Sequence, residues 1–309
     1  MSEFSGVADT MLIPMAARIY ASKRFPEYFY DETALSLEEK IPGETLERIW
    51  KSSSEYTMLA SVARYHNFDE ITKNFIAAHE KCNIINLGAG LETAAFRLQA
   101  ESVQTTGMQA NIIQADNLQA ANVQTSGNHT VDIRTAGIYT GGAIFYEIDL
   151  PEVIELRKNI LGKKGNETLI GADLFTLKWA ENIDASLPSL LVVSGVFQYF
   201  HEEKILSFLS DVKKRFPAGE LIFDATNEIG IKYANKYVKK TGNASAHMYF
   251  YVNDCLAFAK KCDMELVERR TFYTAARKML KRKLKLYTRI AMKACDDGGR
   301  TVILHLKLN

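Results

Sequence analysis

From Cys82 onward, short β-branched and apolar runs alternate with amphipathic stretches. In Glu202–Arg215, for example, apolar side chains recur at the spacing of one helix face. Strand-like runs lie at Asn83–Leu87, Ile144–Ile148, Thr168–Ile170, Leu190–Val193, Leu221–Asp224, Glu265–Thr271 and Thr301–Leu306. This alternation predicts an α/β fold with a mostly parallel sheet and helices on both faces. The last two runs do not follow the same alternation of strand and helix, so they are candidates for antiparallel pairing.

Before Cys82 the pattern is helical instead. Helical stretches lie at Met11–Ser22, Leu46–Trp50, Tyr56–Arg64 and Phe68–His79. We expect residues 1–80 to form a helical cap over the edge of the sheet and residues 81–309 to form the α/β domain.

One segment, Gln99–Ala143, breaks this organisation. It holds only four charged residues and is rich in Gln, Asn, Thr, Ala and Gly. A degenerate unit recurs in it as VQTTG, VQTSG and IRTAG, and each copy ends in a Thr-x-Gly turn signal. So long a loop is uncommon inside a compact domain. We interpret residues 99–143 as a hairpin-rich insertion in a surface loop, with a lid or an oligomer contact as the alternative.

Composition narrows the class of protein. The chain has 309 residues, 47% of them hydrophobic and 24% charged, and a net charge of +1. This balance argues against a protein dedicated to nucleic acid. No apolar run approaches the ~20 residues that span a bilayer, and the N-terminus lacks the pattern of a signal peptide. The four cysteines form no CxxC pair, so we expect a cytoplasmic protein. The six histidines show no ligand spacing, so we expect no metal.

The turn after the first strand is the first candidate for binding chemistry. In the sequence N-L-G-A-G-L-E-T, Gly88, Ala89 and Gly90 precede a helix. Glycine lets the backbone turn sharply and approach a ligand, and a helix N-terminus favours negative charge. A nicotinamide-binding turn would have a third glycine where Thr93 stands.

The second strand ends in Y-E-I-D, and an acid at that point suits two ribose hydroxyls. Asp149 follows Gly88 by 61 residues, and removing the 45 residues of the insertion leaves 16, near the usual ~20. Asp149 is therefore the candidate for ribose binding. The alternative is that Asp149 is the N-cap of the helix after Pro151.

Two further strands end in candidate residues. Asp173 follows the third strand and could accept a hydrogen bond from an exocyclic amine such as that of adenine. The fourth strand runs into S-G-V-F-Q-Y-F, which places Ser194 and Gly195 at the crevice where open α/β sheets bind ligands.

Taken together, N-L-G-A-G-L-E-T, F-Y-E-I-D-L-P-E-V-I, G-A-D-L and S-G-V-F-Q-Y-F resemble the S-adenosylmethionine-dependent leucine carboxyl methyltransferase and polyketide O-methyltransferase family. The similarity extends upstream to S-V-A-R-Y-H-N-F-D-E-I-T and covers roughly residues 11–98 and 144–275. It implies a class I methyltransferase (Rossmann-like) fold, with a seven-stranded sheet whose last strand is antiparallel.

The resemblance also implies roles for individual residues, with S-adenosylmethionine as the cofactor. The glycine turn would approach its methionine moiety, and Arg64 would hold the carboxylate. Asp149 and Leu150 would contact the ribose. The adenine would meet Asp173 and Leu174, with Ser194 and Gly195 lining the crevice.

Two positions depart from the family pattern. Ala94 stands where an arginine often follows G-L-[ED]-T, although Arg97 remains nearby. Ser194 stands where the family has a glutamate before G-V-x-x-Y, so no acid role is carried over to this position.

Transfer from a sulfonium chiefly needs the acceptor oxygen to be held about 3–3.5 Å from the methyl group and aligned with it. A carboxylate acceptor needs no base, whereas a hydroxyl acceptor does. Tyr199, His247 and Tyr249 are candidates for that base because of their position near the expected acceptor loops. Packing in the cap and a surface loop are the alternatives for the tyrosines and the histidine.

Between Arg277 and Lys293 there are eight basic residues and no acidic ones. An apolar stripe that includes Leu280, Leu284 and Tyr287 accompanies them, which predicts one basic amphipathic helix between the last two strands. A solvated outer face is one interpretation. Docking of an acidic protein or of an anionic membrane surface is the other.

The sequence thus predicts an S-adenosylmethionine-dependent O-methyltransferase acting on a carboxylate or hydroxyl of a small molecule or peptide terminus. One alternative is a non-catalytic module that keeps the fold and uses the insertion or the basic helix as a partner surface. A nicotinamide-dependent oxidoreductase fits the glycine turn and Asp149, but it does not explain Asp173 and Leu174.

Overall fold

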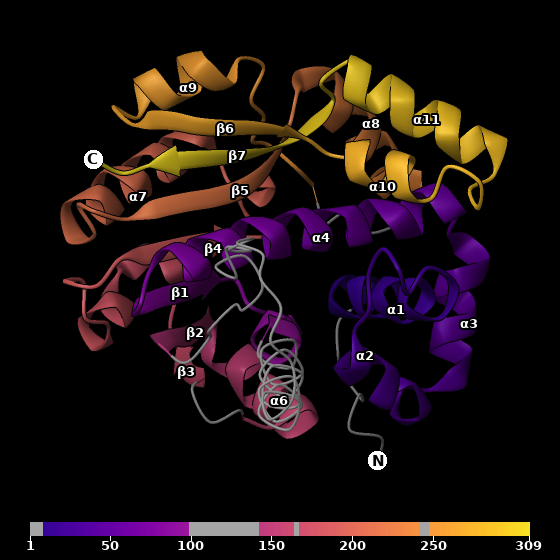
Figure 1. The fold of residues 1–309 in the computed structure, drawn as a ribbon, viewed down its shortest axis with the longest axis horizontal. Coiled ribbons are helices and arrows are strands. Elements are labelled where there is room, and N and C mark those ends of the chain that lie inside the picture. The colour runs from indigo at the N-terminus through magenta and orange to yellow at the C-terminus, as the bar shows by residue number, and fades with distance from the viewer. Residues whose placement is uncertain (1–8, 99–141, 164–166, 241–246) are drawn as a thin grey trace, which may run out of the picture.

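The computed structural model describes residues 9–98, 142–163, 167–240 and 247–309 (Figure 1). All but the last two residues of the predicted insertion 99–143 lie outside this part of the chain. The hairpins predicted there therefore stay a prediction.

A seven-stranded sheet forms the centre of the molecule. The strands are β1 (Cys82–Leu87), β2 (Ala143–Asp149), β3 (Glu167–Gly171), β4 (Ser189–Val193), β5 (Glu220–Thr226), β6 (Glu265–Thr271) and β7 (Thr301–Lys307). Their order is β3-β2-β1-β4-β5-β7-β6, and β7 pairs antiparallel with both β5 and β6 while the other pairs are parallel. The predicted class I methyltransferase fold is confirmed, including the antiparallel final strand.

Side chains alternate between the two faces of the sheet, as the period of a strand requires. On β1, Ile84 joins an apolar cluster with the cap helices, whereas Ile85 and Leu87 join a second cluster on the other face. The second face is covered by α7 (Glu202–Arg215) and α9 (Cys255–Lys261). The α/β part also contains α6 (Pro151–Leu161) and α8 (Glu228–Lys240). Helices therefore cover both faces, as predicted.

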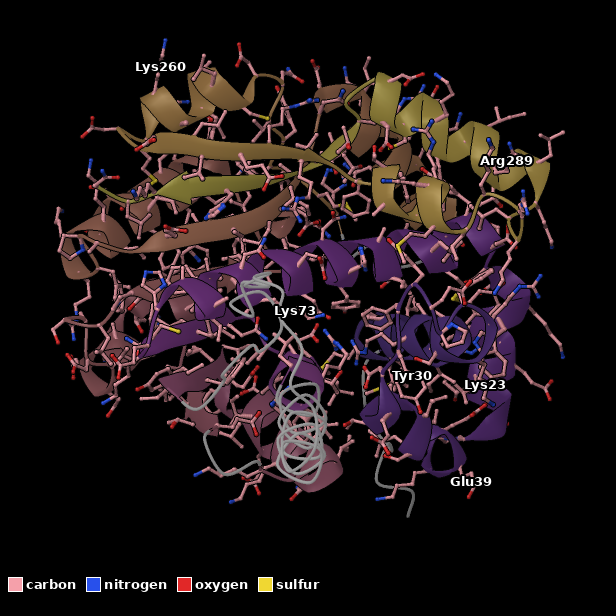
Figure 2. All side chains as sticks on the ribbon, viewed as in Figure 1. Lys23, Tyr30, Glu39, Lys73, Lys260 and Arg289 are labelled. Carbon is pink, nitrogen blue, oxygen red and sulfur yellow. The ribbon has the colours of Figure 1, made fainter. Side chains whose placement is uncertain are left out.

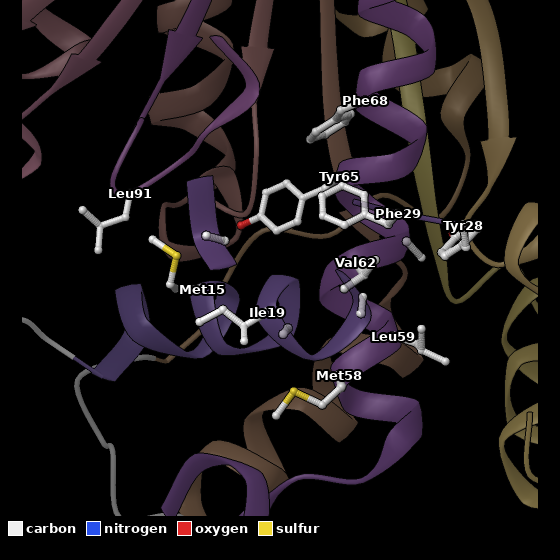
Figure 3. Packing of buried hydrophobic residues seen from close by; sticks show 14 of the residues in the cluster. Met15, Ile19, Tyr28, Phe29, Met58, Leu59, Val62, Tyr65, Phe68 and Leu91 are labelled. Carbon is white, nitrogen blue, oxygen red and sulfur yellow. The ribbon is translucent and has the colours of Figure 1, made fainter. Parts of the chain in front are cut away.

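The cap is built around one long helix. Its helices are α1 (Asp9–Arg24), α2 (Glu32–Ser36), α3 (Gly43–Ser52) and α4 (Glu55–Ala78). The two helices predicted within residues 56–79 are a single helix, which begins with a capping box formed by Ser54 and Thr57. Met15 and Ile19 of α1 belong to the same apolar cluster as Leu59 of α4 (Figure 3). Because α4 also packs on the sheet through residues such as Phe75, it joins the cap to the α/β part.

The prediction of one basic helix over residues 277–293 is wrong. The segment forms α10 (Thr274–Met279) and α11 (Leu286–Asp297), with a turn between them. Leu280 and Leu284 in that turn are buried, and Glu55 Oε1 accepts a hydrogen bond from the backbone N–H of Lys285 at 2.9 Å. These contacts with the start of α4 dock the turn onto the cap, so a new helix begins after Lys285.

Candidate functional site

The strand order reverses between β1 and β4, and the carboxyl ends of β1 to β4 lie at one edge of the sheet. Ligands bind open α/β sheets at such a switch point. The cap reaches this edge, because Arg18 of α1 donates to Leu91 O at 2.6 Å and Thr93 bonds to Asp31.

The glycine turn after β1 has the conformation that its composition predicts. Gly88 and Gly90 have φ values of 75° and 47°, a region that other residues rarely adopt. A Cβ on Gly88 would lie 2.4 Å from Val196 Cγ2, so the turn packs closely on the loop after β4. A Cβ on Gly90 would meet no atom within 4 Å, so its backbone borders open space. Ala89, between them, donates its N–H to Ile148 O at 3.0 Å.

Asp149 joins the glycine turn to the end of β2. Its Oδ2 accepts from the Gly90 N–H and its Oδ1 from the Leu150 N–H, both at 2.8 Å. Burial raises the pKa of Asp149, and these two amides oppose the rise. A carboxylate oxygen can accept more than one hydrogen bond, so both oxygens keep acceptor capacity for ribose hydroxyls. The N-cap alternative is wrong, because the N-cap of α6 is Leu150.

Two buried arginines hold the carbonyl groups of the same turn. Arg157 of α6 donates to Gly90 O at 3.2 Å and to Glu92 O at 2.5 Å, while Arg18 donates to the intervening Leu91 O. Arg157 also pairs with Glu167 at 2.7 Å. Three consecutive carbonyls are thus fixed by guanidinium groups from the cap and from α6. Neither contact is predictable from the sequence, because nothing in the local pattern marks an arginine as buried.

Arg97 connects the turn with helix α4. It makes a bidentate contact with Asp69 at 2.8 and 3.0 Å and reaches Glu92 at 2.8 Å. All three residues are buried. Ala94, at the position where the family often has arginine, is half-buried. Arg97 therefore supplies the cation that ties the helical residues 94–98, which follow the glycine turn, to α4.

Arg64 of α4 lies over the turn that follows β4. Gly195 has a φ of 69°, and a Cβ there would lie 2.4 Å from Arg64 Nη1. Asp224 accepts from the Gly195 N–H at 2.6 Å and lies 3.3 Å from Arg64 Nε. Arg64 Nε is a buried atom without a hydrogen-bond partner among the described residues. Since Val196 packs on Gly88, the structure brings Arg64, Gly195 and the glycine turn together.

The end of β3 carries the next two predicted residues. Asp173 is exposed and its Oδ1 accepts from the Phe175 N–H at 2.9 Å, which caps a single 3-10 turn, η4 (Leu174–Thr176). Leu174 is buried. The neighbouring Ala172 N–H donates to Asp149 O at 2.8 Å, so the loops after β2 and β3 lie side by side.

Ser194 lines a small cavity between the sheet and α4, together with Asn86 and Glu147. The cavity measures about 20 Å³, room for about one water molecule. Glu147 accepts from Asn86 at 2.9 Å. Burial raises the pKa of Glu147 to about 7, while Arg157 opposes the rise. The structure thus shows a buried carboxyl group across the cavity from Ser194.

The three predicted base candidates lie in different surroundings. Tyr199 is half-buried at the end of η6 (Phe197–Tyr199), in the loop after β4 over which Arg64 lies. His247 and Tyr249 are exposed. Their rings lie 4.8 Å apart, and the Tyr249 ring lies 4.2 Å from that of His201. The structure therefore brings only Tyr199 beside Arg64 and the crevice, and it places the other two in a surface aromatic group.

In the described ranges, no cluster of three or more His, Cys, Asp or Glu side chains could hold a metal ion. The same part of the chain has no helix with both the length and the apolarity needed to cross a bilayer.

Comparisons with known proteins bear on the family and on the fold. The family model for leucine carboxyl methyltransferase matches residues 11–109. The tetracenomycin polyketide synthesis O-methyltransferase TcmP of Streptomyces glaucescens is 23% identical over 240 residues, 77% of this chain and 73% of that protein. A solved structure from Thermobifida fusca YX, described as a candidate methyltransferase, has a TM-score of 0.51 and 12% identity, and covers 94% of this chain and 93% of that one. The structural likeness supports the fold.

Proposed function

We propose that this chain, which is similar to the leucine carboxyl methyltransferase family over residues 11–109 and to the O-methyltransferase TcmP, methylates a carboxylate or hydroxyl oxygen of a small molecule or peptide terminus with S-adenosylmethionine. The observation that carries this proposal is the hydrogen bond from the Gly90 N–H to the Asp149 carboxylate. The Gly90 backbone also borders open space. A carboxylate fixed next to an accessible glycine backbone suits a ligand that has both a ribose and a small polar chain.

The residues at the edge of the sheet fit this cofactor. Asp149 and the exposed residue Leu150 would contact the ribose, while Asp173 and Leu174 would meet the amine and the face of the adenine. The Arg64 guanidinium lies over the turn after β4 and pairs with Asp224 through Nε, and the carboxylate of the methionine moiety could pair with the same cation. Gly88, Ala89 and Gly90 would border the methionine moiety, and Ser194 and Gly195 the opposite side.

When bound, S-adenosylmethionine supplies a methyl group already activated by the sulfonium charge. The protein's task is then to hold the acceptor oxygen in line and to exclude water. The cap would exclude water, because α1 and α4 lie over the loops that follow β1 and β4. A carboxylate acceptor would need no proton transfer.

A hydroxyl acceptor would need a base, and Tyr199 is the best placed of the predicted residues. Tyr199 lies in the loop after β4, over which Arg64 also lies, and this position is the ground for the choice. His247 and Tyr249 could act only on an acceptor that extends to the surface aromatic group. Phenols and carboxylates of polyketide type are the first acceptors to test, because TcmP is named for polyketide synthesis.

Calorimetric titration with S-adenosylhomocysteine tests the proposal. We expect saturable binding by the intact protein and a loss of at least about tenfold in Asp149→Ala, which removes charged hydrogen-bond acceptors. Glu152→Ala is the matched control, because Glu152 is an exposed acid three residues away, and we expect it to bind normally. Absence of binding, or binding of NADH instead, would refute the assignment.

A radiolabelled methyl-transfer assay with a panel of small phenols and carboxylic acids separates an enzyme from a non-catalytic module. Labelled product from any acceptor would support the enzyme. Cofactor binding without transfer across the panel would favour the module.

A further inference from the structure

Helix α11 buries one face and carries exposed apolar residues on the opposite face. Thr288, Met292 and Cys295 are buried against the rest of the protein. On the outer side, Leu286, Tyr287 and Ile290 are 66%, 69% and 60% exposed. Nearby on α10, Met279 is 48% exposed. The outer apolar residues are therefore available to something outside the described chain.

The same surface is strongly cationic. We define the α10–α11 surface as the exposed apolar residues above together with the cations Lys278, Lys281, Arg282, Lys283, Lys285, Arg289 and Lys293. Lys283 pairs with Glu27, and Lys293 with Asp297. The other five cations form no ion pair with any described residue. Figure 2 shows the Arg289 side chain at the periphery of the molecule.

Exposed apolar residues and cations on one surface indicate which kind of partner it can bind. A second copy of the chain would bring identical cations face to face, which costs free energy. An anionic partner would instead neutralise them. The apolar side chains stand out from the helix, so a protein partner would need a matching groove for each one. A lipid surface needs none, because it offers anionic headgroups above a fluid apolar layer.

We propose that the α10–α11 surface docks the protein on an anionic membrane surface. Leu286, Tyr287 and Ile290 enter the boundary between headgroups and acyl chains, and the surrounding cations contact the headgroups. Basic side chains flanking an interfacial aromatic residue match the composition of segments that lie in this boundary.

The position of the surface supports this orientation. The turn between α10 and α11 is bonded to the cap, through Glu55 to Lys285 and through Glu27 to Lys283. In Figure 1, α10 and α11 lie at the same end of the molecule as α3 and the start of α4. Docking would therefore place the cap beside the membrane.

Co-sedimentation of the full chain with lipid vesicles tests the proposal without any cofactor, so its outcome is independent of methyl transfer. We expect binding to vesicles of phosphatidylcholine mixed with phosphatidylserine, weak binding to phosphatidylcholine alone, and weakening by salt. The variant Leu286→Ser/Tyr287→Ser/Ile290→Ser and the variant Lys281→Glu/Lys285→Glu should each lose at least about tenfold in affinity.

Lys158→Glu/Lys260→Glu is the matched control, because it reverses two exposed lysines on α6 and α9. It should bind vesicles as the unmodified protein does. Thermal unfolding shows whether each variant is folded; since every changed side chain is exposed, we expect little change.

Three results would overturn the proposal: no binding that depends on phosphatidylserine, equal loss in the control, or full vesicle binding by the serine variant. Fluorescence anisotropy with a labelled polyglutamate peptide covers the other partner class. Peptide binding that the serine substitutions do not affect, without vesicle binding, would show that the surface serves an acidic protein instead.

Discussion

The arginines around the glycine turn and the cations of the α10–α11 surface are basic side chains in opposite surroundings. Arg18, Arg97 and Arg157 are buried, and each contacts carboxylates or backbone carbonyls at 2.5–3.4 Å. Most cations of the α10–α11 surface have no ionic partner among the described residues. A buried guanidinium must recover its lost hydration from fixed partners, whereas a hydrated one need not. Burial thus makes the first group structural and leaves the second free to bind.

The largest expected change in the free energy of unfolding comes from replacing Arg97. Arg97→Leu would leave the buried carboxylates of Asp69 and Glu92 without their shared partner, and breaking a buried pair in this way costs about 3–5 kcal/mol. Urea denaturation of both proteins measures the difference. A loss below about 1 kcal/mol would show that the buried cluster does not depend on this cation.

The next effect is on the pH dependence of stability. The raised pKa of Glu147, about 7 against an ordinary value of 4.5, means that the folded protein keeps a proton that the unfolded chain has lost in this range. The contribution of Glu147 to the free energy of unfolding therefore falls as pH rises from about 4.5 to about 7, by about 3 kcal/mol.

Glu147→Gln should remove this contribution. Unfolding free energies measured across that pH range should fall less steeply for the variant than for the unmodified protein. Parallel curves for the two proteins would contradict the buried, protonated state of Glu147.

A smaller effect is expected at Arg157. Lysine keeps the charge, but it cannot hold Glu167 and two turn carbonyls at once. We expect Arg157→Lys to lose about 1–2 kcal/mol of stability and about tenfold in affinity for S-adenosylhomocysteine. Urea denaturation and calorimetry measure the two changes.

Arg215→Lys is a close control for the second measurement. Arg215 also donates to two backbone carbonyls, Ala180 O and Ile183 O, but on the other face of the sheet. The Arg215→Lys variant should lose some stability and keep the affinity of the unmodified protein for S-adenosylhomocysteine. An equal loss of affinity in both variants would mean that Arg157 has no special role at the glycine turn.

The smallest effect is expected on the α10–α11 surface. Lys281→Ala and Lys285→Ala should each change the free energy of unfolding by less than about 0.5 kcal/mol, because neither lysine side chain has an ion-pair partner among the described residues. A larger loss of unfolding free energy in denaturation experiments would show that these lysines stabilise the fold, as the buried arginines around the glycine turn do.

Much of the fold was predictable because its signals are local. Each strand carries its own apolar run, and Asp149 stands at the end of β2, where the sequence Y-E-I-D predicted a strand end. The contacts of Arg18 and Arg157 were not predictable, because they join positions 73 and 65 residues away in the chain. The break between α10 and α11 was missed for the same reason, since it depends on Glu55, 230 residues from Lys285.

The central claim is that the strand ends next to Gly90 and Asp149 bind an adenosyl group. A crystal structure of the protein with S-adenosylhomocysteine tests it most directly. The claim predicts ribose hydroxyls within hydrogen-bond distance of Asp149 and an adenine beside Asp173 and Leu174. A ligand bound elsewhere, or one that contacts neither aspartate, would contradict it.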